Sequence, residues 1–379
     1  MTAEAADRRA AVRDFPVVDK VSASVYEVPT DRPEADGTLA WSKTTLVVAQ
    51  VSGGGRAGIG YTYASGACKP LIEGELAAAI AGHSVLDTGA AWQAMVRAIR
   101  NLGRPGLVSC AISAVDTALW DLKATLLGLP VSGLLGAART EVPVYGSGGF
   151  TTYDEAAARA QLERWTGDLG IPRVKIKIGE SWGARPGRDL ARIVFARRVI
   201  GPDAELYVDA NGGYGRKQAV RVARAMAEQD VTWFEEPVSS DDLDGLREVR
   251  DQVTPDVAAG EYGYDLVYFA RMIDAQAVDC LQADVTRCGG ITEWLRAAAV
   301  AAARNLQISG HCAPNLHAHV AAAVPNLRHL EYFHDHARIE SMLFDGALSP
   351  KGGSMRPDSA RPGLGLALKE PDATRFRVA

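Results

Sequence analysis

The sequence predicts an α/β protein in which a barrel of eight parallel strands, joined by seven helices, follows a smaller α+β domain. At 379 residues the chain is long enough for both parts. From Glu141 onward, short apolar runs alternate with helix-like segments. Acid–base residues stand where these runs end, at intervals of 20 to 32 residues, about one strand, one helix and their loops. They are Lys177, Asp209, Glu235, Glu261, Asp284, His311 and Glu331.

Composition and charge exclude several classes of protein. Hydrophobic residues make up 47% and charged residues 23%, which is typical of a soluble globular protein. A net charge of −5 argues against nucleic-acid and membrane-surface partners. No apolar run reaches the roughly 20 residues that cross a bilayer, and the first residues lack the apolar core of a secretory signal. The five cysteines show no paired spacing, so we expect reduced thiols and a cytoplasmic protein.

The amino-terminal part predicts antiparallel strands at 17–28, 43–51 and 58–63, the last two joined by a glycine-rich turn. Residues 29–41 between the first two strands are too many and too polar for a hairpin turn. A loop of this length in a compact domain is usually a functional lid or a disordered segment. Helices are expected at 74–81, at 89–101 and at 111–127, the last ending at Gly128 with Pro130 just beyond.

The barrel follows from alternating strand and helix patterns. Its expected strands are 142–147, 174–178, 206–209, 231–235, 257–260, 278–283, 307–310 and 329–331. Its expected helices are 153–168, 188–200, 216–229, 240–252, 265–275, 292–305 and 315–323. Nothing helical is expected after the eighth strand, because residues 349–365 are rich in glycine and proline. This predicts a (β/α)7β modified TIM barrel over 139–345, a cap over 1–138 with its lid at 29–41, and a segment over 346–379 that returns to the cap.

Lys175 and Lys177 lie two apart on the second barrel strand, so both side chains point to the same side. A lone pair of this kind usually marks a solvated strand face, but a central barrel strand has no such face. Each ammonium disfavours the charge of the other, and a nearby metal cation adds to this effect. We therefore expect Lys177 to be neutral near pH 7 and to act as a base.

Three carboxylates, Asp209, Glu235 and Glu261, end three consecutive strands. Any single one could be a helix N-cap. Three together crowd like charges at one barrel mouth, which is costly unless a cation neutralises them. An oxygen-only set without Cys or His suits Mg²⁺ better than zinc. Strand parity favours Glu235 over the neighbouring Glu236 as the inward residue.

Asp284 and His311 end the sixth and seventh strands, which are adjacent in a barrel. A carboxylate beside an imidazole orients the ring and supports its charged form. His317 and His319 lie two apart on a predicted helix and so do not share a face, which makes a metal site there a poor hypothesis. Lys177 and His311 are expected on opposite walls, where each faces one side of a bound substrate carbon.

These residues resemble the enolase superfamily, and within it the mandelate racemase subgroup, over essentially the whole chain. The matching motifs are KIK at 175–177, VDAN at 208–211, FEEP at 234–237, AGE at 259–261, QAD at 282–284, SGH at 309–311 and HLE at 329–331. The segment 111–136 is also similar to a family signature. It departs from that signature at Thr125, a structural position, where a basic residue or glutamine is usual.

The resemblance implies a role for each residue. Asp209, Glu235 and Glu261 would bind one Mg²⁺ per active site, which holds the carboxylate of a small-molecule substrate. Lys177 would be the base on one face, and the dyad of His311 with Asp284 would serve the other. Substrate-binding roles are implied for Lys175 beside Lys177, Glu331 as a hydrogen-bond partner of the enediolate, Asn211 beside the metal, and Trp41 and Tyr61 near the lid. Such proteins are often homo-oligomers, from dimers to octamers.

The shared step is removal of the proton α to a carboxylate. Relatives that act as muconate-lactonizing enzymes or dipeptide epimerases have a lysine on the wall opposite the KIK motif, whereas here only Lys217, in a predicted helix, lies between Lys177 and Lys351. Dehydration of an acid sugar to a 2-keto-3-deoxy acid is favoured, partly because the lid carries Asp31, Arg32, Glu34 and Asp36. Racemisation or epimerisation of a 2-hydroxy acid stays open, as does a catalytically inactive binding protein on the same barrel. The motifs do not decide whether His334 and His336 reach the pocket.

Overall fold

The computed structural model describes residues 15–379, and the larger part of it is a closed barrel of parallel strands. Each strand pairs with the next one in sequence, and the last pairs with the first, with Leu330 opposite Val144. The strands are β4 (Val142–Gly148), β5 (Arg173–Lys177), β6 (Glu205–Asp209), β7 (Val231–Glu235), β8 (Asp256–Ala259), β9 (Cys280–Ala283), β10 (Gln307–Gly310) and β11 (Leu327–Phe333). The predicted barrel and its eight strands are therefore confirmed.

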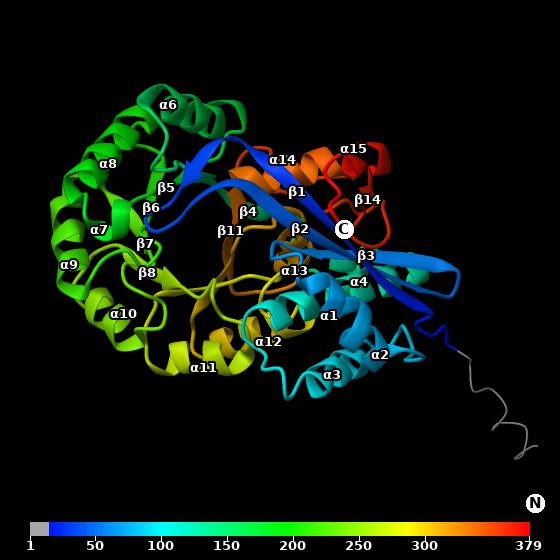
Figure 1. Ribbon diagram of the computed structural model, residues 1–379. Helices are drawn as coiled ribbons and strands as arrows, with labels where there is room; N and C mark the ends of the chain where they lie inside the picture. The colour runs from blue at the N-terminus through cyan, green and yellow to red at the C-terminus, as the bar shows by residue number, and fades with distance from the viewer. Residues whose placement is uncertain (1–14) are drawn as a thin grey trace, which may run out of the picture.

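Helices surround the barrel as a ring, which Figure 1 shows from one end. They are α6 (Glu155–Glu163), η4 (Arg164–Asp168), α7 (Glu180–Gly183), α8 (Pro186–Ile200), α9 (Arg216–Ala225), η5 (Ala227–Gln229), α10 (Leu243–Arg250), α11 (Leu266–Asp274), α12 (Ile291–Ala302) and α13 (Pro314–Ala322). Three of them begin at an aspartate whose carboxylate accepts a backbone N–H of the first turn: Asp154, Asp242 and Asp265. These caps fix where the helices start after their loops.

A further helix, α14 (His334–Leu343), begins directly after β11. The prediction that nothing helical follows the eighth strand is therefore wrong. No side chain caps the start of α14, so the usual sequence signal is missing. The helix is held instead by burial of residues such as Ile339 and Leu343.

The cap consists of an antiparallel sheet and short helices. Its sheet has the order β1 (Lys20–Ala35), β2 (Ala40–Gly53) and β3 (Arg56–Thr62). Its helices are α1 (Cys68–Leu71), η3 (Ile72–Leu76), α2 (Ala77–Ile80), α3 (Thr88–Ala98), α4 (Leu107–Leu127) and α5 (Val131–Leu135). As the sequence predicts, α4 ends at Gly128, which has a φ of 68°.

The predicted loop at 29–41 is a hairpin tip instead. Strand β1 runs to Ala35 and β2 begins at Ala40, with a register shift between Pro29 and Glu34. The prolines of this segment are tolerated because β1 is an edge strand and the shift breaks the ladder where they lie. Figure 1 shows this hairpin, in blue, reaching from the cap over the barrel.

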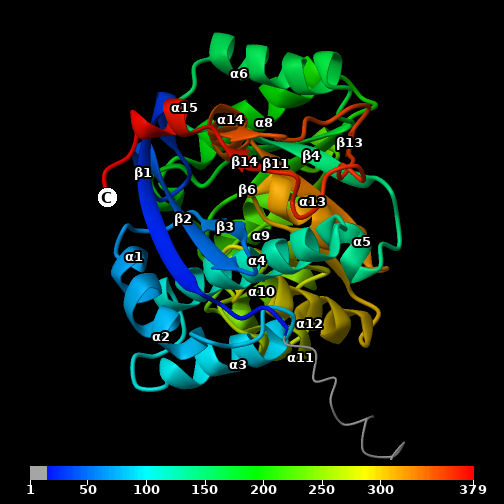
Figure 2. The same cartoon turned by 90° about the vertical axis from the view of Figure 1, so that its right-hand side faces the viewer.

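The carboxyl-terminal residues pair with the free edge of β1. The amide of Val25 donates to the carbonyl of Ala379, and the amide of Val378 donates to the carbonyl of Val25, both at 2.8 Å. Before this contact, β12 (Phe344–Asp345) pairs with β14 (Ala367–Leu368), β13 (Ser354–Met355) pairs with β4, and α15 (Glu370–Thr374) follows. Figure 2 shows the carboxyl terminus beside β1. The edge of the cap sheet is thereby covered.

Cap and barrel also meet along α4 and α12. The buried carboxylate of Asp116 on α4 accepts hydrogen bonds from the amide and hydroxyl of Thr292 on α12, at 2.9 and 2.6 Å.

All five cysteines are free and buried, in agreement with the prediction of reduced thiols. Among the described residues, no helix combines the length and apolar character needed to span a bilayer.

Candidate active site

Three carboxylates gather at the carboxyl ends of three consecutive barrel strands. Asp209 and Glu235 are the last residues of β6 and β7, and Glu261 lies two residues beyond the end of β8. All three are buried, and one oxygen of each lies within 4.8 Å of the others. The structure thus brings together the three residues that the sequence predicts as metal ligands.

The oxygen atoms around this cluster fit a hard cation. Oδ1 of Asn211 is buried without a hydrogen-bond partner, and Oε2 of Glu261 makes no hydrogen bond although Nε2 of His311 lies 3.3 Å away. The amide and Nδ2 of Asn211 donate to the carboxylate of Asp209 at 2.8 and 3.3 Å, so Asn211 is anchored beside the cluster. Unpaired buried oxygens are costly, and a divalent cation with oxygen ligands would satisfy them. The donor set therefore suits Mg²⁺.

Glu235, rather than Glu236, belongs to this cluster, as strand parity indicates. Glu236 is nevertheless buried beside it, with a φ of 38° and an unpaired Oε1. Burial, followed by the charge of Glu261, raises the pKa of Glu236 well above its ordinary value. Glu236 therefore adds a protonatable group at the edge of the cluster.

Both lysines of β5 point into the barrel mouth. Nζ of Lys177 lies 2.5 Å from Oδ2 of Asp209, while Lys175 contacts Glu235 and lies 2.8 Å from Oε1 of Glu331. Burial lowers the pKa of Lys177, but the charges of Asp209 and the neighbouring carboxylates together outweigh burial and hold that pKa above its ordinary value. Lys177 is therefore charged in this arrangement, because a carboxylate, not a second cation, is its nearest charge, and its role as a neutral base beside a bound cation stays a prediction.

His311 and Asp284 form the predicted dyad. Nδ1 of His311 lies 2.8 Å from Oδ2 of Asp284, whose Oδ1 accepts hydrogen bonds from the amide and hydroxyl of Thr286. Nε2 of His311 lies 3.3 Å from Oε2 of Glu261. Burial opposes the charged ring, yet the acidic groups around it, Glu261 among them, hold the pKa of His311 well above its ordinary value. This arrangement favours an imidazolium.

Lys177 and His311 line the same cavity, which has a volume of about 350 Å³. Lys177 ends β5 and His311 follows β10, so the two come from different walls of the barrel. The tip of the β1–β2 hairpin closes one side of the cavity with Asp36, Leu39 and Trp41. The remaining lining residues are Lys43, Thr44, Thr45, Tyr63, Ala64, Asn211, Glu261, Tyr262, Arg287, Cys312, Phe333 and His336.

Of the two aromatic residues expected to bind substrate, Trp41 lies at the cavity and Tyr61 does not. Trp41 lines the cavity, and its indole N–H donates to Oε2 of Glu34 at 2.8 Å. Tyr61 is fully buried, stacks on Phe344 with ring centroids 5.2 Å apart, and does not line the cavity. The expected placement of Tyr61 at the cavity is therefore wrong, and Tyr63 lines the cavity instead.

Glu331 accepts hydrogen bonds from several buried donors. Ser147 Oγ lies 2.5 Å from its Oε1, and the amide of Cys312 lies 3.0 Å from its Oε2. Burial opposes its charge, but Lys175 and further cations hold the pKa of Glu331 well below its ordinary value. The role implied for Glu331, a hydrogen bond donated to the enediolate, requires a protonated carboxyl. In this arrangement the carboxylate is an acceptor that orients Lys175 and Cys312.

Sequence reasoning missed several residues of the site, of which Arg287 and Cys312 contact its charged groups. Nη1 of Arg287 lies 3.1 Å from Oε1 of Glu261, and its Nε lies 3.5 Å from Oδ2 of Asp284. Arg287 lies three residues after Asp284, and this short spacing could have suggested from the sequence that the two side chains meet. Cys312 follows His311 directly, and its Sγ lies 3.3 Å from Nε2 of the ring. Burial raises the pKa of this thiol, so it stays protonated.

The other histidines have structural environments. His336 lines the cavity, stacks on Tyr63 with centroids 3.4 Å apart, and accepts the amide of Ala313 at Nδ1. Burial lowers its pKa to about 3, so it is neutral. His334 lies outside this cavity. His317 and His319 bond to backbone groups inside the fold, which agrees with their exclusion as metal ligands.

Known families match the chain over most of its length. Residues 20–136 match the family described as Mandelate racemase / muconate lactonizing enzyme, N-terminal domain, and residues 157–373 match Enolase C-terminal domain-like. The L-talarate/galactarate dehydratase of Salmonella typhimurium is 30% identical over 97% of this chain and 93% of its own length. A 3,6-anhydro-alpha-L-galactonate cycloisomerase of Streptomyces coelicolor is 30% identical over 93% of this chain and 97% of its own length.

Solved structures agree with these matches. A mandelate racemase/muconate lactonizing enzyme-like protein from Rubrobacter xylanophilus is similar with a TM-score of 0.92 at 50% identity, covering 96% of this chain and all of that one. The Salmonella dehydratase with bound Mg and L-lyxarohydroxamate has a TM-score of 0.89 at 28% identity, covering 98% of this chain and 95% of that one. The chain is therefore an enzyme of the enolase superfamily and belongs to its mandelate racemase/muconate lactonizing enzyme family.

Proposed function

We propose that this enzyme is a Mg²⁺-dependent acid-sugar dehydratase that converts a sugar acid to a 2-keto-3-deoxy acid. The observation that carries the proposal is one cavity with Lys177 on one wall and the His311–Asp284 dyad on another, beside three clustered carboxylates. Relatives that match nearly the full length are named as a sugar-acid dehydratase and a sugar-acid cycloisomerase.

Asp209, Glu235 and Glu261 would hold one Mg²⁺, which when bound supplies positive charge beside the substrate carboxylate and stabilises the enediolate. Lys177 contacts Oδ2 of Asp209, so a cation held by that carboxylate would weaken this contact and would lower the pKa of Lys177 towards the range of a base. Asn211 keeps Asp209 oriented through its two hydrogen bonds.

Lys177 takes the proton from the carbon α to the carboxylate. His311, held as an imidazolium by Asp284, gives a proton to the β-hydroxyl, which leaves as water when its C–O bond breaks. The resulting enol rearranges to the 2-keto acid. Both groups lie in the cavity on separate elements, β5 and the end of β10, so one acts as base while the other acts as acid.

The polar residues that line the cavity support a polyhydroxy substrate. The sequence argument relied on four charged residues of the lid, and most of these lie elsewhere. Of the four charged lid residues, only Asp36 lines the cavity. The other polar lining groups come from β2 and from the loops after the barrel strands: Lys43, Thr44, Thr45, Asn211, Tyr262 and Arg287. Hydroxyl groups of an acid sugar find more partners here than an aromatic ring does.

Racemisation or epimerisation of a 2-hydroxy acid is the second candidate, because it needs the same two opposed groups and no leaving group. The aromatic lining residues Trp41, Tyr63 and Phe333 favour it for less polar acids. A catalytically inactive binding protein is disfavoured, because a mutually repelling carboxylate cluster has no use without its cation.

A screen of mono- and diacid sugars and of 2-hydroxy acids distinguishes these activities. Each compound is incubated with enzyme and Mg²⁺, then assayed for 2-keto product and for optical rotation. Keto product supports the dehydratase. Loss of rotation without keto product supports the racemase, and no conversion of any compound contradicts the dehydratase proposal.

A further inference from the structure

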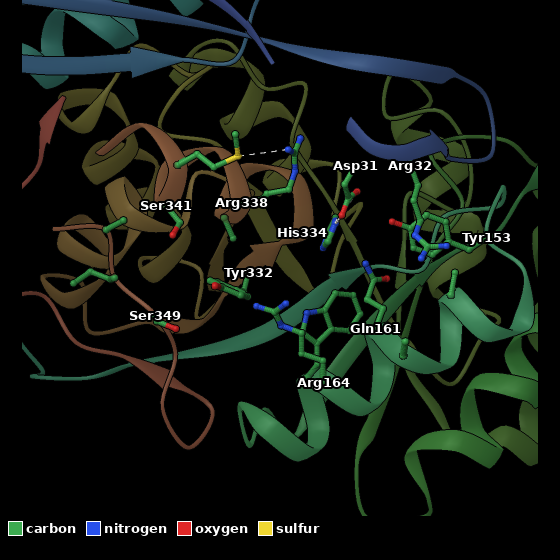
Figure 3. Close-up of a pocket in the computed structure, with 17 residues that line it drawn as sticks. Asp31, Arg32, Tyr153, Gln161, Arg164, Tyr332, His334, Arg338, Ser341 and Ser349 are labelled. Atoms are coloured by element: carbon green, nitrogen blue, oxygen red, sulfur yellow. Dashed lines mark hydrogen bonds and ion pairs between the residues drawn. The ribbon is translucent and has the colours of Figure 1, made fainter. Parts of the chain in front are cut away.

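A second group of metal-ligand residues lies on the outer side of the lid hairpin. Asp31 and Glu34 belong to the irregular part of β1, and His334 is the first residue of α14, directly after β11. One ligand atom of each lies within 4.8 Å of the others. Figure 3 shows Asp31 facing the ring of His334. The lid thus contributes two residues of metal-binding type and the start of α14 contributes a third, at least 300 positions further along the sequence.

The closest contact in this group is between His334 and Asp31, whose Nε2 and Oδ2 lie 3.1 Å apart. Glu34 is only 1% exposed. Its Oε2 accepts the indole N–H of Trp41, while its Oε1 is buried without any hydrogen-bond partner. In either protonation state Oε1 lacks a partner, which is costly unless something else occupies the position.

The group has a route to solvent that is separate from the active site. Asp31 and His334 line a cavity of about 570 Å³, and none of the residues lining it lines the catalytic cavity. Arg32, Arg164 and Arg338 also line it, and Arg338 is paired with Asp335 at 2.5 Å. Asp31 is the acidic residue that lines this cavity, and the unpaired Oε1 of Glu34 is buried beside it.

We propose that Asp31, Glu34 and His334 bind a second divalent cation, of the Zn²⁺ type, which fastens the lid hairpin to the start of α14. One imidazole with two carboxylates suits a first-row transition metal better than Mg²⁺, which prefers oxygen ligands. The site is distinct in ligand chemistry and position from the three carboxylates at the barrel mouth.

Such a cation would also act on the catalytic cavity through one hydrogen bond. Glu34 accepts from Trp41, and Trp41 lines the catalytic cavity. A cation that held Glu34 in place would also hold the indole of Trp41, which forms part of the wall of the catalytic cavity. The second site therefore positions the lid and does not take part in bond making.

Zn²⁺ binding to the metal-free full-length protein tests the proposal, measured by equilibrium dialysis with metal analysis. Zn²⁺ also enters oxygen sites, so the comparison is between variants. We expect wild type to bind one equivalent more than His334→Gln or Asp31→Asn. Asp209→Asn is expected to lose a different equivalent and to keep this one. His83→Gln, a partly exposed histidine of the cap, is the matched control and should bind as wild type does.

Equal Zn²⁺ binding by wild type and both lid variants would overturn the second site, whatever happens to the activity. Hydrogen exchange of the amides in 29–41 tests its effect on the lid. Zn²⁺ should slow exchange there in wild type and in His83→Gln, but not in His334→Gln. Zn²⁺ binding that leaves this exchange unchanged would overturn the fastening of the lid.

Discussion

Nδ1 of His311 lies 2.8 Å from Oδ2 of Asp284, which leaves Nε2 of the same ring at the cavity side, 3.3 Å from Oε2 of Glu261. The carboxylate of Asp284 is itself fixed by two hydrogen bonds from Thr286. The hydrogen bond and charge of His311 overcome burial and lower the pKa of Asp284 to about 2. An ionised Asp284 therefore holds a charged ring whose second nitrogen can meet a substrate.

Replacing His311 with Asn should abolish turnover, because the acid of one wall is lost. Lys177 remains, so one stereoisomer of a substrate should still exchange its α-proton for deuterium in D₂O. Proton NMR of each stereoisomer measures this directly. His83→Gln controls for loss of a histidine outside the cavity. Equal exchange of both stereoisomers at the wild-type rate would contradict the two-wall assignment.

Replacing Lys177 with Ala should lower kcat by at least roughly 100-fold, the usual contribution of a general base. Lys217→Ala is the matched control, because Lys217 is exposed on α9. Steady-state rates of both variants on the substrate found by screening give the comparison. A Lys177→Ala enzyme with near-normal kcat would remove this lysine from the chemistry.

Much of the barrel and its site could be predicted because the signals are local. A buried parallel strand is a short apolar run, and its carboxyl end lies at the active face, so Asp209, Glu235 and His311 could be placed from sequence. The charge state of Lys177 could not, because it depends on which group lies nearest in space. That group is Asp209, at 2.5 Å.

Other errors have equally physical causes. Helix α14 has no capping residue and forms through burial, so its sequence shows no start signal. The prolines and glycine of 29–41 suggest a loop, but an edge strand with a register shift accommodates them. Tyr61 is buried in the fold, whereas Tyr63, two residues later, lines the cavity. Strand β3 ends between them, at Thr62, so the alternation of a strand does not predict which of the two tyrosines reaches the cavity.

The pair Tyr61 and Tyr63 provides a further prediction. Tyr63→Phe should raise KM, because it removes the hydroxyl that bonds to the carbonyl of His336 and to Glu340 and that holds the ring at the cavity. Tyr61→Phe should leave KM unchanged, because the hydroxyl of Tyr61 is buried, unpaired and away from the cavity. Kinetics of the two variants in parallel make the comparison. An increase in KM only for Tyr61→Phe would reverse the placement of the two rings.

Stability should fall as pH rises through the range in which Asp116 titrates. Burial raises the pKa of Asp116 to about 7 in the native protein, from an ordinary value of 3.8. Between these values the unfolded chain binds fewer protons than the native protein, so the free energy of unfolding decreases with increasing pH and levels off above about 7. Asp116→Asn removes this contribution.

Urea unfolding of wild type and Asp116→Asn at about pH 5 and about pH 8 measures the effect. The decrease in the free energy of unfolding between the two values should be smaller in the variant, by an amount on the order of a few kcal/mol. The same pH dependence in both proteins would show that Asp116 is ionised throughout, held by the hydrogen bonds from Thr292.

The central claim is that Asp209, Glu235 and Glu261 hold a divalent cation between Lys177 and His311. A crystal structure determined with Mg²⁺ tests it most directly. We predict one cation at about 2.0–2.1 Å from an oxygen of each carboxylate, with Lys177 and His311 on either side of the adjacent cavity. Carboxylates that share no cation, or Mg²⁺ bound only elsewhere in the molecule, would contradict the account.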